Sequence, residues 1–376
     1  MSAYLTTPEL LNLSAKHKSH PTLPLSLQDC LRYEHASFDW SELRTSIAYQ
    51  PETRPFLAQV TQLKLLSLNC GGFGIDSNHF RIDLGYQEEC FAKLLAHIRE
   101  HGFTLVHLQD YPYTPELLER LAEVTGYALR AVPQIFLTHA RPCSQDSGLV
   151  VLTHPDLKTS EWTYRYHETN VPKVDGYQRE LAEAEMIFVN GTLGYTVELE
   201  GYSYRLNNTY ICPVSTARKR REVFAAEAKL SREYPRYLLT GDTNLYGTNT
   251  LRRVAGLLPA NPYAFVLNAG SSWLLGRNYP HLRERRRITK LLTKRRLYLA
   301  NRSTGNSIRF ALRNFVPGPL QFLVGNKQVG WLLDLAVTNL NPLPCTLDSE
   351  PFGDVDHASL HITLPRFDNE YGKRYN

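Results

Sequence analysis

The sequence lacks the features that mark several large classes of protein. No apolar run approaches the roughly 20 residues that a membrane-spanning helix needs, and Met1 to Glu9 lack the basic-then-apolar order of a signal peptide. The six cysteines form no CxxC pair and no closely spaced framework, which argues against a zinc site and a disulfide scaffold. There is no internal repeat and no low-complexity tract. We therefore expect a globular protein of a reducing compartment, cytoplasmic or nuclear, with non-classical secretion left open.

Positive charge is modest overall but unevenly distributed. The chain has 376 residues, a formal net charge of +5 and 43% apolar residues, enough for a substantial core. Lys and Arg are concentrated in 283–296, and Ile288, Leu291, Leu292 and Leu297 are interleaved with them or follow them. This pattern predicts an amphipathic basic helix. Its basic face suits nucleic acid or an anionic membrane surface, and an ordinary solvated face is the alternative.

Strand-like and helix-like segments alternate from about residue 62 onward. We interpret 1–60 as an N-terminal extension, 61–366 as one domain, about 275–330 as a basic insertion within it, and 367–376 as a C-terminal tail. Strands are expected at 63–69, 104–109, 134–139, 148–153, 186–190, 195–200, 205–211, 237–240, 331–338 and 358–364, and helices at 87–100, 114–125 and 217–233. Strands mixed with helices, some separated by glycines read as tight turns, predict an α+β fold with two sheets packed face to face and helices outside.

Four short polar strings lie at the ends of apolar runs. The first three follow predicted strands and the fourth precedes one, so their side chains are expected along one rim. Amides, carboxylates and an imidazole at one rim suit a hard cation, a bound phosphate and an attacking water. The strings are Leu68-Asn69-Cys70-Gly71, Leu108-Gln109-Asp110, Thr240-Gly241-Asp242-Thr243-Asn244 and Asp354-Val355-Asp356-His357.

The last two strings carry the chemistry most directly. Gly241 permits a tight backbone path that presents Asp242 and Asn244 together, so Asp242 can accept a proton from water while Asn244 holds the water or a phosphate oxygen. An Asx turn that only ends the strand is the alternative. A protonated His357 can stabilise a phosphorane-like transition state. Asp334, a carboxylate in an otherwise apolar run, is the candidate that orients His357, and a strand-end residue facing water is the alternative.

The order of these elements resembles the endonuclease/exonuclease/phosphatase superfamily. Asn69, Asp110, Asp242 with Asn244, Asp334, and Asp356 with His357 match its sequence of strand-end residues. Asp242-Thr243-Asn244-Leu245 and Ser215-Thr216-Ala217-Arg218 resemble the 5′-tyrosyl-DNA phosphodiesterase branch in particular. The resemblance covers about residues 62–365 without the basic insertion. It implies a four-layer α/β/β/α sandwich, in which two packed mixed β-sheets are flanked by helices.

The resemblance also implies roles for individual residues. Asn69 and Asp110 would bind Mg²⁺ or Mn²⁺, with Asp356 assisting the metal or the water. Asp242 would activate the water, Asn244 would hold the phosphate, and His357, oriented by Asp334, would contact the scissile phosphate. Tyr210 stands where apurinic endonucleases present a phenol to the phosphate. Ser215 and Arg218, at the start of a helix, could bind a phosphate, with a helix cap and an exposed arginine as the alternative.

Three positions depart from the family pattern. Asp110 follows Gln109 where the family has Glu, which shortens the reach of the carboxylate. Val355 replaces a serine, and Tyr210 stands where many members have His. Asp110 is the departure that bears most on metal binding.

Three functions fit these residues. The preferred hypothesis is a metal-dependent phosphodiesterase acting on nucleic acid or a blocked nucleic-acid end. The alternatives are a phosphoinositide or inositol phosphatase or a sphingomyelinase-like phosphodiesterase at an anionic membrane, and a binding protein of the same fold with impaired catalysis. We expect a monomer whose partner is a phosphate-containing polyanion.

Overall fold

The computed structural model describes residues 38–39, 47–51, 60–71, 73, 75–76, 81–82, 84–137, 147–170, 186–211, 217–245, 280–301, 308–311, 328–331, 334–340, 343–348 and 357–365. Within these ranges the helices are α3 (Leu84–His101), α4 (Pro115–Thr125), α6 (Ala217–Leu230) and α9 (Pro280–Lys294). The central strands are β3 (Lys64–Asn69), β6 (Leu105–Pro112), β7 (Ala128–Leu137), β8 (Ser147–Thr153), β9 (Lys158–Asn170), β10 (Met186–Leu199), β11 (Tyr202–Tyr210), β12 (Tyr237–Asp242), β16 (Asp334–Thr338) and β18 (Ser359–Thr363). The shorter strands are β1 (Phe38–Asp39), β2 (Ile47–Tyr49), β4 (Ile75–Asp76), β5 (Arg81–Ile82), β13 (Tyr298–Leu299), β14 (Ile308–Ala311), β15 (Gln328–Trp331) and β17 (Cys345–Asp348).

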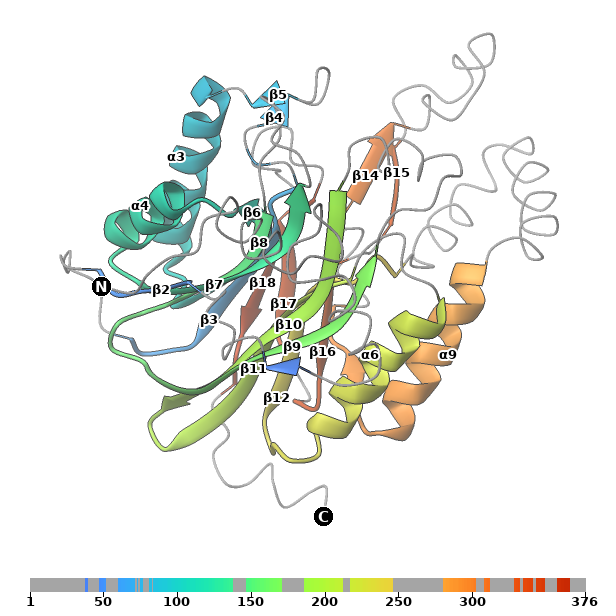
Figure 1. Cartoon of the computed structure of the whole chain (residues 1–376). Coiled ribbons are helices and arrows are strands. Elements are labelled where there is room, and N and C mark those ends of the chain that lie inside the picture. The colour runs from blue at the N-terminus through green and yellow to red at the C-terminus, as the bar shows by residue number, and fades with distance from the viewer. Residues whose placement is uncertain are drawn as a thin grey trace, which may run out of the picture.

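Within the described ranges, 14 strands form one continuous hydrogen-bonded sheet that folds into two facing halves (Figure 1). One half has the order β7-β8-β6-β3-β18-β17, and the other has the order β10-β11-β12-β16-β13. The halves are joined where β10 pairs with β7 through Met186 to Phe188. Side chains then cross between the halves: His107 Nδ1 of β6 lies 2.7 Å from Thr240 Oγ1 of β12.

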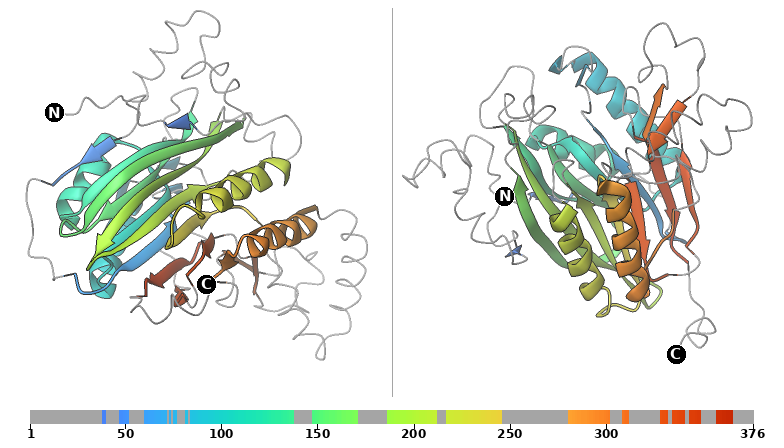
Figure 2. Two further views of the ribbon diagram at one scale, coloured as in Figure 1. Left: turned by 90° about the horizontal axis from the view of Figure 1, so that it is seen from below. Right: turned by 90° about the vertical axis from the view of Figure 1, so that its right-hand side faces the viewer.

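In the part of the chain that the structure describes, three separate apolar cores define the layers. The first lies between the two halves of the sheet and includes Leu65, Leu105, Leu206 and Leu238. The second joins one half to α3 and α4, and the third joins the other half to α6 and α9. Two perpendicular views show these helix pairs on opposite sides of the strands (Figure 2). Alternation along each strand sends successive side chains to opposite faces, which is why each sheet contributes to two cores. The predicted four-layer α+β sandwich is confirmed.

Several element predictions need correction. The segments 186–190 and 195–200 belong to one strand, β10, because the glycines between them make room for neighbours instead of forming turns. A Cβ at Gly191 would lie 2.3 Å from Tyr164 Oη, and a Cβ at Gly194 would lie 2.3 Å from Asn207 Oδ1. Strand β7 begins at Ala128, earlier than predicted, and β9 was missed. The predicted strand 331–338 contains the end of β15 and all of β16.

The basic helix is present as α9. Ile288 and Leu292 are buried in the core shared with α6, whereas Arg287, Lys290 and Lys294 are exposed. The helix is therefore a component of the outer layer of the sandwich with its cations toward solvent. The rest of the insertion and the domain boundaries stay predictions. Among the described residues, no helix is long and apolar enough to cross a membrane.

Candidate active site

The ends of four strands meet at one rim of the sandwich. Asn69 is the last residue of β3, Asp242 is the last of β12, and Asp334 is the first of β16, directly opposite Asp242 in antiparallel register. His357 precedes β18, which runs antiparallel to β3 and so begins beside the end of β3. Residues from distant parts of the chain are thereby brought together in a buried cluster of Asn69, Asp242, Asp334 and His357.

Gly241 fixes the backbone that carries Asp242. Its φ is +137°, and a Cβ at this position would lie 1.9 Å from the carbonyl oxygen of Thr209 in the adjacent strand β11. Only glycine fits this approach without a shift of the backbone. The glycine before Asp242 therefore serves the close pairing of β12 with β11.

A single amide nitrogen links the two halves of the cluster. Asn69 Nδ2 donates to Asp242 Oδ2 at 2.9 Å and lies 3.3 Å from His357 Nε2. The Asn69 side-chain oxygen accepts from Gly71 N at 2.9 Å, which fixes the orientation of the amide. Asn69 thus holds the carboxylate and the imidazole beside each other.

Asp242 is a carboxylate with raised basicity. It is 2% exposed. Burial raises its pKa to about 7, the Asp334 carboxylate acts in the same direction, and His357 and hydrogen bonds from Asn244 and Asn69 act against it. A carboxyl group with a pKa near neutral pH is suited to general base catalysis.

His357 is oriented by Asp334. The distance from His357 Nδ1 to Asp334 Oδ2 is 2.7 Å, and both side chains are buried. Because an ionised carboxylate only accepts hydrogen bonds, Nδ1 carries the proton in this contact. His357 Nε2, which faces Asn69 Nδ2, is then the nitrogen that can accept or release a proton. Asp334 thus lies beside His357, the position that the sequence predicts for the orienting residue. It is buried and does not face water as in the alternative interpretation.

Asn244 supports Asp242. Its backbone N–H donates to Asp242 Oδ1 at 2.8 Å, and its side-chain Nδ2 donates to Asp242 Oδ2 and to the carbonyl oxygen of Ile211, both at 2.9 Å. The first contact is the Asx turn considered as an alternative. Both amide hydrogens point at protein oxygens, so the role of Asn244 in holding a phosphate stays a prediction. Tyr210 is buried and lies beside Asp242 in parallel register, and its role also stays a prediction.

Asp110 lies at a β-bulge immediately after Gln109, which is in register with Asn69. Its φ is +52°, and its backbone N–H donates to Gln134 Oε1 at 3.1 Å. Burial raises the pKa of the Cys70 thiol, and the Asp110 carboxylate adds to this increase, so that carboxylate lies within electrostatic reach of the residue after Asn69. Asp110 is half-buried, which leaves part of its side chain open to solvent.

Asn69 and Asp110 have side chains that suit a hard divalent cation. One carboxylate and one amide oxygen are an all-oxygen donor set, and Mg²⁺ needs few protein ligands because it retains several waters. Among the described residues, the Asn69 oxygen accepts one hydrogen bond, from Gly71 N, which leaves a second lone pair for a cation. The structure thus offers the donor types that the metal prediction requires.

Three predicted site residues are not part of this cluster as described. Asp356 and Ser215 lie outside the described residues. Arg218 is exposed on the first turn of α6, with Nε 3.5 Å from Glu222 Oε1. This is the exposed arginine of the alternative interpretation, and phosphate binding by Arg218 stays a prediction.

A polar layer below the site was missed by the sequence interpretation. His107 Nε2 lies 2.9 Å from the hydroxyl of Tyr195, and Gln109 Nε2 donates to Asn208 Oδ1 at 2.6 Å. These contacts join β6 to β10 and β11 across the core between the sheets. The sequence signal for this layer is the alternation of side chains along the predicted strand 105–109. It places His107 and Gln109 on the same face as Leu105, which is buried between the sheets.

No family model matches the chain, and no curated protein matches it by sequence. Similar solved structures include the endonuclease/exonuclease/phosphatase from Bacteroides vulgatus, at 11% identity over 82% of this chain and 100% of that one, with a TM-score of 0.49. The endonuclease/exonuclease/phosphatase from Beutenbergia cavernae shares 13% identity over 81% of this chain and 71% of that one, with a TM-score of 0.49. Humanized D. rerio TDP2 shares 13% identity over 82% of this chain and 100% of that one, with a TM-score of 0.45. These proteins belong to the superfamily that the sequence resembles; similarity at this level concerns the fold.

Proposed function

We propose that this protein is a metal-dependent phosphodiesterase that hydrolyses a phosphate ester of nucleic acid, or of a blocked nucleic-acid end, by in-line attack of water. One observation carries the proposal. The Asn69 amide holds a buried carboxylate, Asp242, beside an imidazole, His357, which has a second carboxylate, Asp334, behind it. A base and a phosphate-binding group at one rim are the parts that such a displacement needs.

Asp242 is proposed to take the proton from the attacking water. Its two oxygens are held by Asn69 and Asn244, so the carboxylate keeps one orientation. Its pKa near 7 lets it both accept a proton and release it at neutral pH. Asn244 acts here as a positioning residue.

His357 is proposed to contact the phosphate through Nε2. The Asp334 carboxylate fixes the ring and favours its protonated form, in which Nε2–H can donate to an oxygen of the phosphate. Asn69 Nδ2 lies 3.3 Å from Nε2, so protonation of Nε2 requires a small displacement of the amide or of the ring.

Asn69 and Asp110 are the proposed ligands of Mg²⁺ or Mn²⁺, with Asp356 as a further candidate. When bound, such a cation supplies a Lewis acid that neutralises negative charge on the phosphate oxygens. Asn69 would hold the cation through its side-chain oxygen while its Nδ2 stays beside Asp242 and His357.

The exposed cations of α9 support a polyanionic substrate. Arg287, Lys290 and Lys294 share an exposed surface of the outer helical layer. Lysine and arginine on one surface attract phosphate chains in a salt-dependent manner. Nucleic acid is proposed over a lipid headgroup, and the experiment distinguishes the two.

The experiment compares substrates of both classes at fixed Mg²⁺. Single-stranded, duplex and 5′-blocked oligonucleotides are incubated with the full chain, in parallel with vesicles that contain phosphoinositide or sphingomyelin. We expect turnover of an oligonucleotide that stops on addition of a chelator. Turnover of lipid alone would contradict the nucleic-acid substrate, and absence of turnover on every substrate would contradict the proposed activity.

A further inference from the structure

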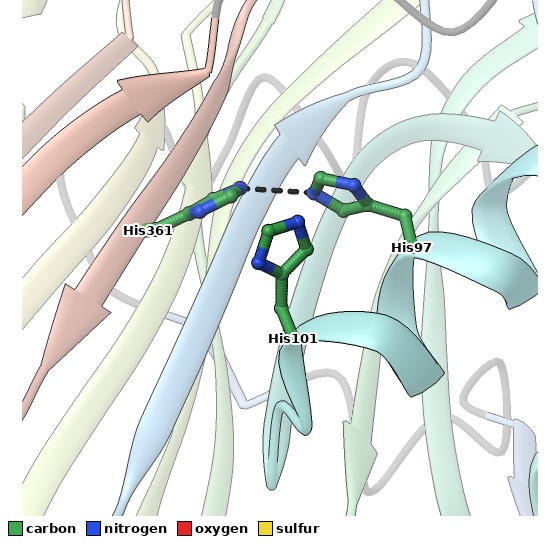
Figure 3. A group of neighbouring side chains, drawn as sticks. All are labelled: His97, His101 and His361. Atoms are coloured by element: carbon green, nitrogen blue, oxygen red, sulfur yellow. Dashed lines mark hydrogen bonds between the residues drawn. The ribbon is translucent and has the colours of Figure 1, made fainter.

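Three histidines converge between helix α3 and strand β18 (Figure 3). His97 and His101 lie one helical turn apart on α3, which places both side chains on the same face of the helix. His361 reaches them from β18, and its Nε2 is 2.9 Å from His97 Nε2. One ring nitrogen from each of the three residues lies within 4.8 Å of the others.

The fold directs the third imidazole toward the helix. Leu360 and Ile362 of β18 belong to the core between the sheets, so His361 between them projects from the opposite face, which α3 covers. Phe103, just after α3, packs against all three rings, with centroid distances of 5.6 Å to His97, 5.6 Å to His101 and 4.8 Å to His361. All three rings therefore pack against the Phe103 ring. Each histidine is half-buried, so a small solute can reach it.

The protonation states suit a ligand that needs lone pairs. Burial lowers the pKa of His361 to about 4, and His97 and His101 act in the same direction. Burial also lowers the pKa of His97, again with a contribution from His101. Neutral imidazoles can bind a cation without losing a proton to solution. In the hydrogen bond between the two Nε2 atoms one of them carries the proton, so binding through both requires that ring to hold its proton on Nδ1 instead.

Polar groups next to the imidazoles favour a cation there. Ser359 Oγ lies 3.0 Å from His361 Nε2 and 3.5 Å from His97 Nε2. Asp348 of β17 is in register with Ser359, and its negative charge opposes the lowering of both histidine pKa values, so it lies within electrostatic reach of the rings. A negative charge and a hydroxyl beside metal-bound imidazoles would stabilise a bound cation.

We propose that His97, His101 and His361 form a binding site for a transition-metal ion of the Zn²⁺ type. Three imidazole nitrogens suit Zn²⁺, Co²⁺ or Ni²⁺ and are poor ligands for Mg²⁺. Tetrahedral Zn²⁺ with bonds of 2.0–2.1 Å would separate its nitrogen ligands by about 3.3 Å. The nitrogens of His97 and His361, now 2.9 Å apart, would have to separate by only a few tenths of an ångström.

Binding at this site would fasten α3 to β18. The two ligands on α3 belong to the outer helical layer, and the third lies on the strand that begins two residues after His357. The ion would thus link the outer layer to the strand that follows His357 of the candidate active site. It supplies no group to the proposed hydrolysis, and its donor set differs from that of Asn69 and Asp110.

The first test measures binding directly. The full chain without an affinity tag is freed of metal and titrated with Co²⁺ and Zn²⁺, and the Co²⁺ complex is followed by its visible absorption. We expect one tight site per chain with the intense bands of tetrahedral cobalt, displaced by Zn²⁺ and unaffected by excess Mg²⁺. Absence of these bands in the folded chain at millimolar Co²⁺ would overturn the proposal.

The second test assigns the ligands. His97→Gln and His361→Gln retain a polar side chain and are each expected to weaken Zn²⁺ binding by at least about tenfold. Asp242→Asn, which removes the proposed base, is expected to bind Zn²⁺ as the unaltered chain does. Equal Zn²⁺ affinity in both histidine variants and the unaltered chain would overturn the proposal.

A stability measurement guards against variants that fold poorly. Zn²⁺ is expected to raise the unfolding temperature of the unaltered chain and of Asp242→Asn but not of His361→Gln. An equal rise in all three would place the Zn²⁺ elsewhere and overturn the proposal. Because the readouts are spectra and unfolding, they are independent of the proposed hydrolysis, and either proposal can fail alone.

Discussion

The backbone of Asp110 gives a physical reason for its departure from the family pattern. Its φ of +52° lies in the left-handed region. Asp and Asn adopt this region several times more readily than most side chains, because their short polar groups can bond locally to the backbone. Glutamate lacks this advantage. The bulge therefore favours the shorter acid, and its carboxylate lies within electrostatic reach of Cys70, the residue after Asn69.

Substitutions at Asp110 separate backbone strain from metal binding. Asp110→Glu is expected to lower the free energy of unfolding by about 1 kcal/mol and to reduce activity, because Glu fits the left-handed backbone less well. Asp110→Asn keeps the preferred backbone but loses the charge, so we expect near-normal stability and a higher Mg²⁺ concentration at half-maximal rate. Urea unfolding and Mg²⁺ titration of the rate measure the two effects. An unchanged Mg²⁺ requirement in Asp110→Asn would exclude Asp110 as a ligand.

Asp334 is expected to act through His357. Asp334→Asn keeps the shape of the side chain but removes the charge 2.7 Å from His357 Nδ1. The protonated imidazole is then less stable, and we expect kcat to fall by about 10²–10⁴-fold with a small change in KM. Because the Asp334 carboxylate also raises the pKa of Asp242, its loss should move the acidic limb of the activity profile to lower pH. The matched control is Asp156→Asn, an exposed position whose side chain is 59% accessible. Equal kcat in both variants would contradict the positioning role.

At the scale of elements, the junction of β12 with β11 decides where Asp242 lies. Gly241 permits the close approach to Thr209, and the strands stay in register up to the pair of Tyr210 and Asp242. A side chain at 241 would push this end of β12 away from β11. The carboxylate would then move relative to Asn69 on the opposite half of the sheet.

Two glycine substitutions test this junction. Gly241→Ala is expected to destabilise the fold by about 3 kcal/mol or more, because its Cβ would lie 1.9 Å from Thr209 O. Gly201→Ala is the control, with φ +82° and no atom of the described residues within 4 Å of an added Cβ, so it should cost only about 1–2 kcal/mol of backbone strain. Thermal and urea unfolding give both values. Equal losses would show that the close approach at Gly241 is unimportant.

The buried contact of His107 with Thr240 and Tyr195, between the two halves of the sheet, makes the free energy of unfolding depend on pH. Burial lowers the pKa of His107 from its ordinary value of 6.5 to about 3, so the folded chain holds it neutral where the unfolded chain protonates it. Between these values the unfolded state binds more protons. The contribution of His107 to the free energy of unfolding therefore falls as pH decreases from 6.5 to about 3, by about 1.4 kcal/mol per pH unit at most.

His107→Gln removes the titrating group and keeps hydrogen-bonding capacity toward Thr240 and Tyr195. We expect the difference in unfolding free energy between the unaltered chain and this variant to shrink as the pH is lowered below 6.5. Urea unfolding at several pH values measures it. A difference that stays constant over this range would mean that His107 is not held neutral in the folded state.

Most of the elements could be predicted from the sequence because their periodicity is strong. Strands such as β3 and β12 have continuous buried runs, and α4 begins at a proline and is capped by Gly126 directly after its last residue. The glycines of β10 were misread because their neighbours, Tyr164 and Asn207, come from other strands and are invisible in local sequence. The rim residues were found because strand ends converge. The metal-binding histidines proposed here were not, because His361 lies 260 residues after His101 in sequence and only the fold brings them together.

At the scale of the whole molecule, the four layers keep the proposed active site apart from the helix proposed to attract the substrate. The rim carries the buried carboxylates and imidazole, whereas α9 presents its cations from an outer layer. Burial raises the pKa of Asp242 at the rim, and exposure leaves the lysines of α9 in a position to attract phosphates. Changes on α9 should therefore affect substrate binding more than chemistry.

Charge reversal on α9 tests this separation. Lys290→Glu is expected to raise KM for an oligonucleotide, to reduce the dependence of binding on salt, and to leave kcat nearly unchanged. Lys93→Glu on α3 changes net charge equally on the opposite helical layer, where the exposed Lys93 pairs with Glu89, and serves as the control. Steady-state kinetics at several salt concentrations measure both. Equal effects of the two variants would indicate general charge rather than an α9 binding surface.

The most direct test of the proposed active site is kcat/KM for an oligonucleotide substrate in Asp242→Asn and His357→Ala, with Asp156→Asn as the control. Far-ultraviolet circular dichroism establishes that each variant is folded. We expect both site variants to lose at least about 10²-fold in kcat/KM, because one lacks the base and the other lacks the imidazole that contacts the phosphate. Asp156→Asn should retain the activity of the unaltered chain. Folded Asp242→Asn and His357→Ala proteins with unchanged kcat/KM would contradict the assignment of this rim as the active site.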